Sequence, residues 1–257
     1  MNTEDLALDG TAYTAPAFTS QDADRAPKLA ERLAAKVEQE ILRSGWPVGE
    51  VIGNEPELIT RFGVSRAIFR EAVRILENHG VVEMRRGPGG GLVITSPDGG
   101  AITQAAALYL AYKGASTASL LETRLALEVS CAERAAQKID EAGIKRLRNV
   151  LRTEAARERP WHHSHELHNE IASIAANPVF ELFVDVLLSL TERHLRRLVD
   201  NMVATGADPR DLIEESRRAH HAIVEAIVGG DAALARHRMQ RHIEGIQPYL
   251  LRPNGAF

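Results

Sequence analysis

The feature of this sequence that most constrains its fold is the succession of helical patterns from residue 101 to about residue 250. Apolar residues recur there at spacings of three and four, which is the period of a half-buried helix. Start and stop signals such as Asn177-Pro178 and Gly229-Gly230 divide the stretch into six or seven helices. We find no strand pattern and no long repeat in it. The region therefore predicts an all-α antiparallel bundle with short loops.

A different pattern precedes this bundle. An apolar stripe with a four-residue spacing runs from Leu29 to Ile41, and "SGWPVGE" ends it. Two shorter helical segments, "NEPELITRF" and "GVSRAIFREAVRILENHG", then meet at a turn that Gly63 permits. Two β-rich runs around a Gly/Pro tip in "VVEMRRGPGGGLVIT" predict a hairpin. Three helices followed by a hairpin predict a winged helix-turn-helix.

Because helical patterns dominate both regions, we expect a mainly α protein. The composition of the segments between and around these regions indicates the domain boundaries. Residues 1–27 are rich in Ala, Thr and Asp without a sustained period, and we expect a disordered tail there. The stretch "SPDGG" falls in a linker over residues 96–101. The winged domain is thus expected at 28–95 and the helical domain at 102–250, with a second tail at 251–257.

Composition also narrows the class of protein. The single cysteine, Cys131, excludes an internal disulfide framework and fits a reducing cytoplasm, and its helical context predicts a small buried residue. No apolar run approaches the ~18 residues that a membrane span requires. The N-terminus lacks the basic start and apolar core of a signal peptide. We therefore expect a cytoplasmic protein without a membrane partner.

Arginines gather where a helix-turn-helix would meet DNA. The second helix after a tight turn is placed for the major groove, and here it carries Arg66 and Arg70 one turn apart on one face. Arginine is the usual reader of guanine. Arg86 and Gly87 lie at the hairpin tip. The alternative is an ordinary solvated face, since residues 28–98 hold ten Lys/Arg and ten Asp/Glu, but the clustering favours DNA binding.

The segment "ITRFGVSRAIFREAVRILENHGVVEMRRGPGGGLV" resembles the winged helix-turn-helix of the GntR family of bacterial transcription regulators. The resemblance covers about residues 28–95 and departs at two places. Pro56 occupies a position that is usually basic and often contacts phosphate, and Ala67 and Ile68 follow "SR" where many members have Thr. The DNA contacts that the resemblance implies are Ser65, Arg66, Ala67, Ile68, Arg70, Arg86 and Gly87.

Three histidines lie on the apolar faces of three expected helices. His168 aligns with Ile171, His220 with Ile223, and His242 follows Met239 by three residues. Inward-facing histidines on several helices of a bundle can form a metal site. The alternative is three hydrogen-bonded core histidines, and the spacing leaves both open. The remaining histidines that we weighed are expected at helix starts or in solvent: His162, His163, His221 and His237.

The helical region resembles the ligand-sensing FCD domain of the FadR subfamily. Its motifs occur in order in "LLETRLALEVSCAERAA", "SHELHNEIASIAANPVF" and "HHAIVEAIVGGDAALARHRMQRHI". The resemblance implies a divalent metal held by His168, His220, His242 and an aspartate, but Ser164 occupies the aspartate's position. Three neutral imidazoles and a water suit Zn²⁺, so zinc is the expected ion. His165 is a candidate replacement for the lost carboxylate.

In the same family pattern, Arg124 meets the carboxylate of a small organic-acid effector that the metal also binds. The alternative is an i,i+4 ion pair with Glu128. A buried arginine without an anionic partner would be costly, which favours the effector role. For Asn177 a helix cap before Pro178 is a sufficient explanation.

The sequence therefore predicts a cytoplasmic, homodimeric transcription regulator that binds operator DNA and is not an enzyme. The family pattern implies repression until an effector binds, whereas the residues alone do not determine whether the protein represses or activates transcription. A metal-dependent hydrolase is an alternative, because three histidines could activate water. It lacks a carboxylate placed as general base, and it leaves the winged domain unexplained. A metal-free helical sensor, or a structural helical protein with core histidines, is the other alternative.

Overall fold

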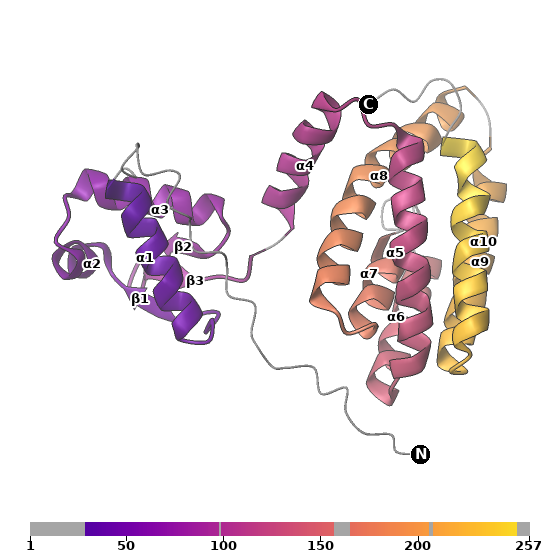
Figure 1. Cartoon of the computed structure of the whole chain (residues 1–257), viewed down its shortest axis with the longest axis horizontal. Helices are drawn as coiled ribbons and strands as arrows, with labels where there is room; N and C mark the ends of the chain where they lie inside the picture. The colour runs from indigo at the N-terminus through magenta and orange to yellow at the C-terminus, as the bar shows by residue number, and fades with distance from the viewer. Residues whose placement is uncertain (1–28, 98, 157–164, 206–207, 251–257) are drawn as a thin grey trace, which may run out of the picture. The chain divides into compact units, whose positions relative to one another are not determined.

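The computed structural model describes residues 29–97, 99–156, 165–205 and 208–250, except for the side chain of Arg193 (Figure 1). The chain divides into two compact units, Met1–Pro97 and Asp98–Phe257, each with its own core. The fold is mainly helical, as predicted, with one small sheet in the first unit. The expected tails lie outside the described residues, and so do His162, His163 and Ser164.

Three helices form most of the first unit: α1 (Leu29–Arg43), α2 (Glu55–Phe62) and α3 (Arg66–Asn78). Asn54 and Glu57 form a capping box at the start of α2, and Pro56 lies in its first turn, where a missing N–H is harmless. Gly63 ends α2 in the left-handed conformation that the turn to α3 requires. Leu29 is half exposed, so the buried stripe of α1 begins one residue later than predicted, at Ala30.

The sheet has one more strand than the sequence predicts. The expected hairpin forms from β2 (Val82–Arg85) and β3 (Gly91–Ile94), paired antiparallel. A third strand, β1 (Val51–Gly53), pairs antiparallel with the other edge of β3, so the order is β1-β3-β2. This strand is only three residues long and ends in glycine, which leaves too little pattern for recognition from sequence. The wing is therefore anchored to the segment that precedes α2.

The second unit contains seven helices among its described residues, within the predicted six or seven. They are α4 (Gly100–Tyr112), α5 (Thr117–Lys138), α6 (Glu141–Ala156), α7 (His165–Ile174), α8 (Pro178–Ala204), α9 (Arg210–Val228) and α10 (Ala232–Leu250). Helix α4 begins at Gly100, within the stretch that the sequence indicates as a linker. Within the described ranges, no helix is both long and apolar enough to span a membrane.

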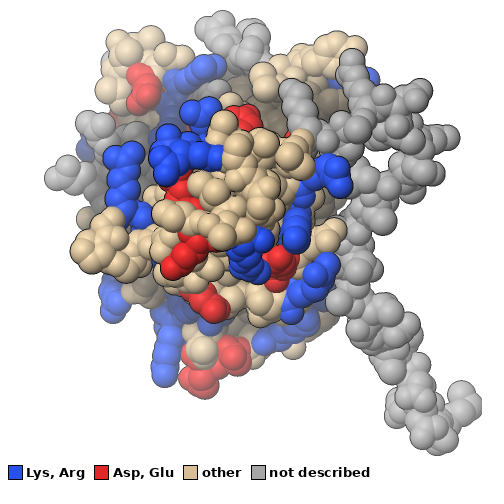
Figure 2. Space-filling model, turned by 90° about the vertical axis from the view of Figure 1, so that its left-hand side faces the viewer, with Lys and Arg blue, Asp and Glu red and all other residues tan. Residues whose placement is uncertain are grey.

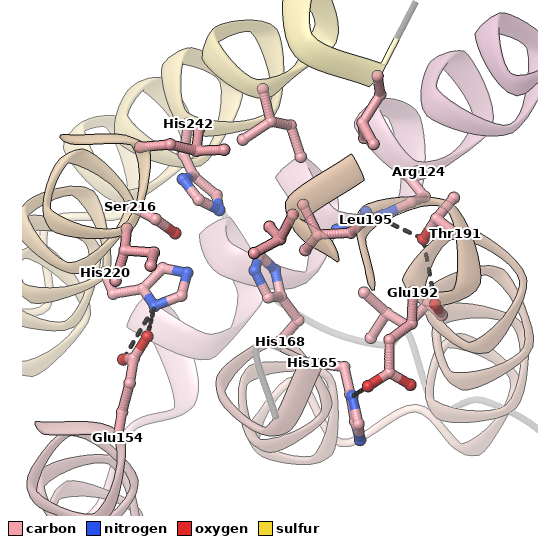
Figure 3. A pocket seen from close by; sticks show the side chains of 16 residues that line it. Arg124, Glu154, His165, His168, Thr191, Glu192, Leu195, Ser216, His220 and His242 are labelled. Carbon is pink, nitrogen blue, oxygen red and sulfur yellow. Dashed lines mark hydrogen bonds and ion pairs between the residues drawn. The ribbon is translucent and has the colours of Figure 1, made fainter. Parts of the chain in front are cut away.

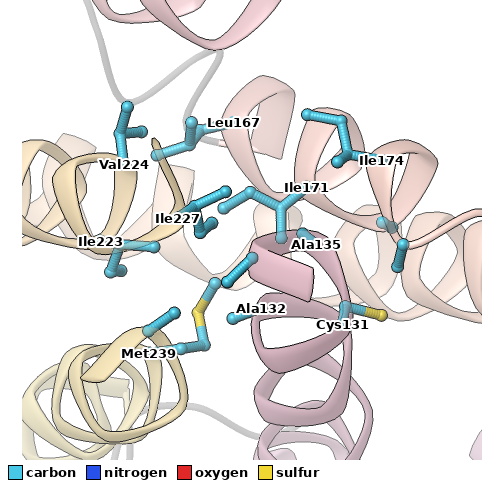
Figure 4. Close-up of a cluster of buried hydrophobic side chains, with 14 of the residues drawn as sticks. Cys131, Ala132, Ala135, Leu167, Ile171, Ile174, Ile223, Val224, Ile227 and Met239 are labelled. Carbon is cyan, nitrogen blue, oxygen red and sulfur yellow. The ribbon is translucent and has the colours of Figure 1, made fainter. Parts of the chain in front are cut away.

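Helix α5 is the centre of this bundle, because α7, α8, α9 and α10 all pack against it. Ala132 and Ala135 are fully buried, and such small side chains let neighbouring helices approach closely (Figure 4). Ile171, Ile227 and Met239 fill the space around them from α7, α9 and α10. Cys131 is buried as predicted, and burial raises the pKa of its thiol to about 12. The same faces of α7, α9 and α10 continue into the site described next.

Candidate metal centre and nucleic-acid interface

Three buried histidines meet inside the helical unit, as the sequence pattern indicated. His168 lies on α7, His220 on α9 and His242 on α10, and each is at most 7% exposed. One ring nitrogen from each lies within 4.8 Å of the others, and the ring centroids are 4.8–5.4 Å apart (Figure 3). Each helix carries its histidine on its buried face, so packing of the bundle brings the three together.

Burial affects the charge of these rings. Removal from water lowers the pKa of His168, and the neighbouring carboxylate of Glu128 only partly offsets this. Burial lowers the pKa of His242 well below its usual value, and the other two histidines lower it further. Both rings are therefore neutral at neutral pH. A neutral imidazole has the free lone pair that a metal requires.

A buried ion-pair network lies behind His168. Glu128 on α5 closely contacts Nδ1 of His168 with one carboxylate oxygen and accepts from Nε of Arg124 with the other, at 2.6 Å. Burial alone would raise the pKa of Glu128, but Arg124 and His168 outweigh it and hold this pKa at about 2. Arg124 also donates to Thr191 Oγ1 at 3.1 Å. The Arg124–Glu128 pair, which the sequence offered as the alternative to effector binding, is therefore present.

A second carboxylate contacts His220, and the sequence analysis missed it. Both oxygens of Glu154 on α6 lie 2.9–3.0 Å from Nδ1 of His220. Burial would raise the pKa of Glu154, but the hydrogen bond from His220, with the electrostatic effect of its neighbours, lowers it overall. Nε2 of His220 is buried and has no hydrogen-bond partner among the described residues. Glu154 and His220 lie 66 positions apart, so no local spacing could have signalled this contact.

The histidines open onto a cavity of about 70 Å³. Figure 3 shows Arg124 and Thr191 on one side of it and His220 with Glu154 on the other. The cavity is lined mainly by apolar side chains apart from these groups, namely Leu188, Leu195, Val199, Leu212, Ile213, Ile246 and Leu250. A site of this kind suits a small ligand with an anionic group and an apolar remainder.

The residues present fit a divalent metal. Three imidazoles from three helices, each able to give one nitrogen to a common point, match the protein ligands of a four-coordinate zinc site. The buried Nε2 of His220 otherwise lacks a partner among the described residues, which a metal would supply. His165 lines the same pocket, but its Nδ1 lies 3.2 Å from Glu192 and it is not part of the three-histidine cluster.

The candidate DNA-contacting residues occupy the start of α3. Ser65 caps this helix by accepting from the N–H of Ile68 at 3.3 Å. Arg66 and Arg70 are exposed, with 68% and 64% of their side chains in solvent, and Ala67 is exposed between them. Ile68 differs, because it is half-buried against the core and presents only part of its surface.

Both arginines share an acidic partner that the sequence analysis did not identify. Oε1 of Glu55, the first residue of α2, lies 3.4 Å from Nε of Arg66 and 3.2 Å from Nε of Arg70. The capping box holds the start of α2 and therefore the position of Glu55. Figure 2, which looks onto the first unit, shows acidic side chains interspersed among the basic ones. The face is thus a mosaic of charges rather than a uniformly basic surface.

The wing presents its candidate residues at the turn between β2 and β3, where Arg86 and Gly87 are both exposed. Gly90 makes the turn possible: a Cβ atom there would lie 2.4 Å from the carbonyl oxygen of Arg85. The chain therefore doubles back so closely that no larger residue fits without a backbone shift. The result is a narrow tip that carries exposed Arg86 beside its glycines, with Arg85 also exposed at the end of β2.

Two family models match this chain, one on each unit. Residues 29–91 match the model described as "Bacterial regulatory proteins, gntR family". Residues 119–245 match the FCD domain. The first unit is therefore similar to the gntR family of bacterial regulatory proteins, and the second unit is similar to the FCD domain. The two matches cover the winged unit and most of the bundle, including all three clustered histidines, whereas assignment to the FadR subfamily goes beyond them.

Curated relatives of this chain are regulators by name. It is 29% identical over 85% of its length to the "HTH-type transcriptional repressor NanR" of Cronobacter sakazakii, covering 84% of that protein. It is 27% identical over 79% of its length to the "HTH-type transcriptional regulator LutR" of Bacillus subtilis, covering 92% of that protein. It is 26% identical over 84% of its length to the "Uxu operon regulator" of Haemophilus influenzae, covering 79% of that protein.

A solved structure agrees in fold. The structure titled "Streptococcus agalactiae GntR" superposes with a TM-score of 0.62 at 24% identity. The superposition covers 85% of this chain and 99% of that one. It supports the arrangement of a winged helix-turn-helix followed by a helical domain.

Proposed function

We propose that the protein is a transcription regulator of the FadR subfamily whose affinity for operator DNA is set by a small organic acid bound at a metal in the helical unit. One observation carries the proposal: the same chain holds two exposed arginines at the start of a recognition helix and three buried histidines around a small cavity. The relatives named as regulators, and one as a repressor, support it.

The proposed DNA interface is the N-terminal end of α3 with the wing. Arg66 and Arg70 contact base edges in the major groove, and Arg86 with Gly87 contacts phosphate or the minor groove. Ser65 and Ala67 lie at the exposed helix start, so they approach the DNA backbone and bases. Ile68 contributes least, because the core covers part of it.

The proposed effector is a short organic acid. A cavity of about 70 Å³ holds on the order of five water-sized groups, which is far less than the volume that drug-sized ligands occupy. The metal, with Zn²⁺ as the proposed ion, would use its open fourth position to bind one carboxylate oxygen. Arg124 lies across the cavity and, besides its bonds to Glu128 and Thr191, has further guanidinium N–H groups that can donate to the same carboxylate. The apolar wall receives the rest of the molecule.

We also propose that the regulator acts as a repressor and a homodimer, since a two-fold protein matches two half-sites on DNA. Several exposed apolar side chains on α4 and α8 support a contact with a second copy, namely Leu108, Tyr109, Tyr112 and Phe183. Effector binding then changes the populations of two dimer states with different operator affinities. The proposed site of action is the cytoplasm.

The geometry favours this role over a metal-dependent hydrolase. Glu128 and Glu154 contact ring nitrogens of the candidate ligands, and Glu192 pairs with His165 and Arg196. Each of these three carboxylates is therefore engaged by a cationic or hydrogen-bonding neighbour. None of the three is placed as a general base beside the open metal position.

A mobility-shift assay tests DNA binding. The wild-type protein is expected to shift its own promoter region at low salt, and Arg70→Ala should weaken this binding by about 5- to 150-fold, the equivalent of ~1–3 kcal/mol. Arg152→Ala, an exposed arginine in the helical unit, removes the same charge elsewhere and should leave the shift unchanged. Absence of any sequence-specific shift by the wild type would refute the regulator proposal.

Metal analysis tests the centre. Protein purified without a His-tag and saturated with Zn²⁺ is expected to retain one ion per chain, and His242→Ala should lose it because one of three protein ligands is gone. His237→Ala is the matched control, since His237 is exposed on the same helix. Equal zinc retention by wild type and His242→Ala would support the metal-free sensor instead.

A further inference from the structure

The contact between Glu154 and His220 joins two helices that are distant in sequence. Glu154 is the third residue from the end of α6, and His220 lies in the second half of α9. His220 is 1% exposed, and 12% of the Glu154 side chain is exposed. Both carboxylate oxygens lie within hydrogen-bond distance of a single atom, Nδ1, so the ring is held from one side only.

This arrangement fixes the tautomer of His220. An ionised carboxylate can only accept hydrogen bonds, so Nδ1 must be the donor and carry the proton. In a neutral ring Nε2 then has the free lone pair. That atom is buried without a hydrogen-bond partner among the described residues, and the ring lines the cavity together with His168 and His242. The carboxylate therefore leaves the unprotonated nitrogen free for a ligand.

A second contact from α9 holds the backbone of Glu154. The guanidinium of Arg217, three residues before His220, donates to the backbone carbonyl of Glu154 at 3.3 Å. This carbonyl belongs to the last turn of α6, where helix carbonyls lack partners within the helix. Two residues on one face of α9 thus hold both the backbone and the side chain of Glu154.

The two carboxylates near the cluster differ in charge balance. Glu128 is matched by the guanidinium of Arg124 at 2.6 Å. Among the described residues, the hydrogen-bond partner of the Glu154 carboxylate is His220, whereas Arg217 binds the backbone and acts on the carboxylate only through its charge. The negative charge of Glu154 is therefore the one that remains available to a cation at the histidine cluster.

We infer that Glu154 is a positioning residue for the metal centre: it orients Nε2 of His220 toward the ion. Through its hydrogen bond to His220 it also places a negative charge near the centre, where the expected aspartate is replaced by the neutral Ser164. This inference rests on the proposed metal binding. A carboxylate behind a ligating histidine raises the basicity of the ring and holds its orientation. Such a charge favours a dipositive ion while the fourth coordination position stays open for the effector.

The test compares Glu154→Ala and Glu154→Gln with the wild type. Affinity for Zn²⁺ is measured by competition with a chelating dye, and the absorption spectrum of bound Co²⁺ reports the ligand geometry. Glu154→Ala should weaken Zn²⁺ binding by about 10- to 100-fold and alter the Co²⁺ spectrum. Glu154→Gln keeps an acceptor but not the charge, so it should lie between. Glu133→Gln, which breaks the exposed pair with Arg236 in the same unit, is the matched control.

A metal-free measurement separates this inference from the metal proposal. The ¹⁵N chemical shifts of His220 in chelator-treated protein report which ring nitrogen carries the proton. The wild type and Glu154→Gln should show Nδ1–H, whereas Glu154→Ala should show a mixture of tautomers. Wild-type Zn²⁺ affinity and an unchanged tautomer in Glu154→Ala would overturn the inference. Failure of the wild type to bind Zn²⁺, with the tautomer shifted as expected, would refute the metal proposal and leave only the orienting role.

Discussion

The two units of this protein use the same pair of residue types, arginine and glutamate, in opposite surroundings. In the winged unit Glu55 contacts Arg66 and Arg70, whose side chains are about two-thirds exposed. In the helical unit Arg124 and Glu128 are 7% and 2% exposed. Exposed pairs contribute about 0–1 kcal/mol and exchange partners readily. Loss of one member of a buried pair costs about 3–5 kcal/mol, because the other charge stays uncompensated.

This difference matches the two tasks that we propose. An arginine that must contact DNA has to leave its intramolecular partner at little cost, so an exposed and weak pair is suitable. A histidine that must present one nitrogen to a metal has to stay in place, so a buried and strong network is suitable. The contrast in burial therefore separates residues that exchange partners from residues that hold a geometry.

The largest expected effect is on the buried pair. Glu128→Gln keeps the shape of the side chain but leaves Arg124 without its ionic partner. We expect the free energy of unfolding of the helical unit to fall by about 3–5 kcal/mol, measured by urea denaturation. Glu133→Gln, which breaks an exposed pair, should cost less than about 1 kcal/mol. Similar losses in the two variants would remove the distinction between the units.

The next effect is a pH dependence confined to the helical unit. The folded state lowers the pKa of His168 and His242 below the ordinary value of 6.5, so the unfolded chain binds more protons just below that pH. Stability of the metal-free protein should therefore fall as the pH drops below 6.5, by at most about 1.4 kcal/mol per pH unit for each histidine. A further loss should follow between pH 4.5 and about 2, as Glu128 takes up its proton.

Chemical denaturation in the presence of a chelator, at several pH values, measures this dependence. His242→Asn removes one of the two titrating rings and should flatten the slope between pH 6.5 and 5 whatever its effect on overall stability. A slope that is unchanged in this variant would show that other groups cause the acid sensitivity.

The smallest expected effect concerns the exposed pairs. Glu55→Gln removes the acidic partner of Arg66 and Arg70, so the DNA-facing surface gains one unit of positive charge. Affinity for non-specific DNA should rise a few-fold, while the ratio of operator to non-specific affinity should fall because the added positive charge strengthens phosphate contacts that carry no sequence information. Fluorescence anisotropy at several salt concentrations measures both. Unchanged affinity for non-specific DNA in the variant would show that Glu55 does not offset the charge of these arginines.

Most of the fold followed from local patterns. Apolar periodicity and capping residues indicated the helices, and the caps at Asn54, Ser65 and Asn177 form as expected. Strand β1 was missed because three residues give no alternation to recognise. Gly99 and Gly100 have the composition of a loop, although Gly99 is the N-cap of α4 and the helix begins at Gly100. Local signals thus specify helices well and very short strands poorly.

The sequence predicted those site residues that lie on the apolar face of a single helix, but not the contacts between helices. His168, His220 and His242 could be selected because each shares a face with apolar residues of its own helix. The contacts of Glu154 and Glu55 depend on how separate helices pack, which no spacing within one helix reveals. The residue at the expected aspartate position, Ser164, lies outside the described residues, so its part in the centre stays a prediction.

The close turn at Gly90 has a consequence for how this regulator can diverge from its relatives. A side chain at Gly90 would collide with the backbone of Arg85, so the path of the wing tolerates little change. Arg86 is exposed beside this turn and is free to vary without disturbing that path. If Arg86 contacts DNA as we propose, point mutations there can retune operator preference over evolutionary time, while the loop that presents the residue is preserved.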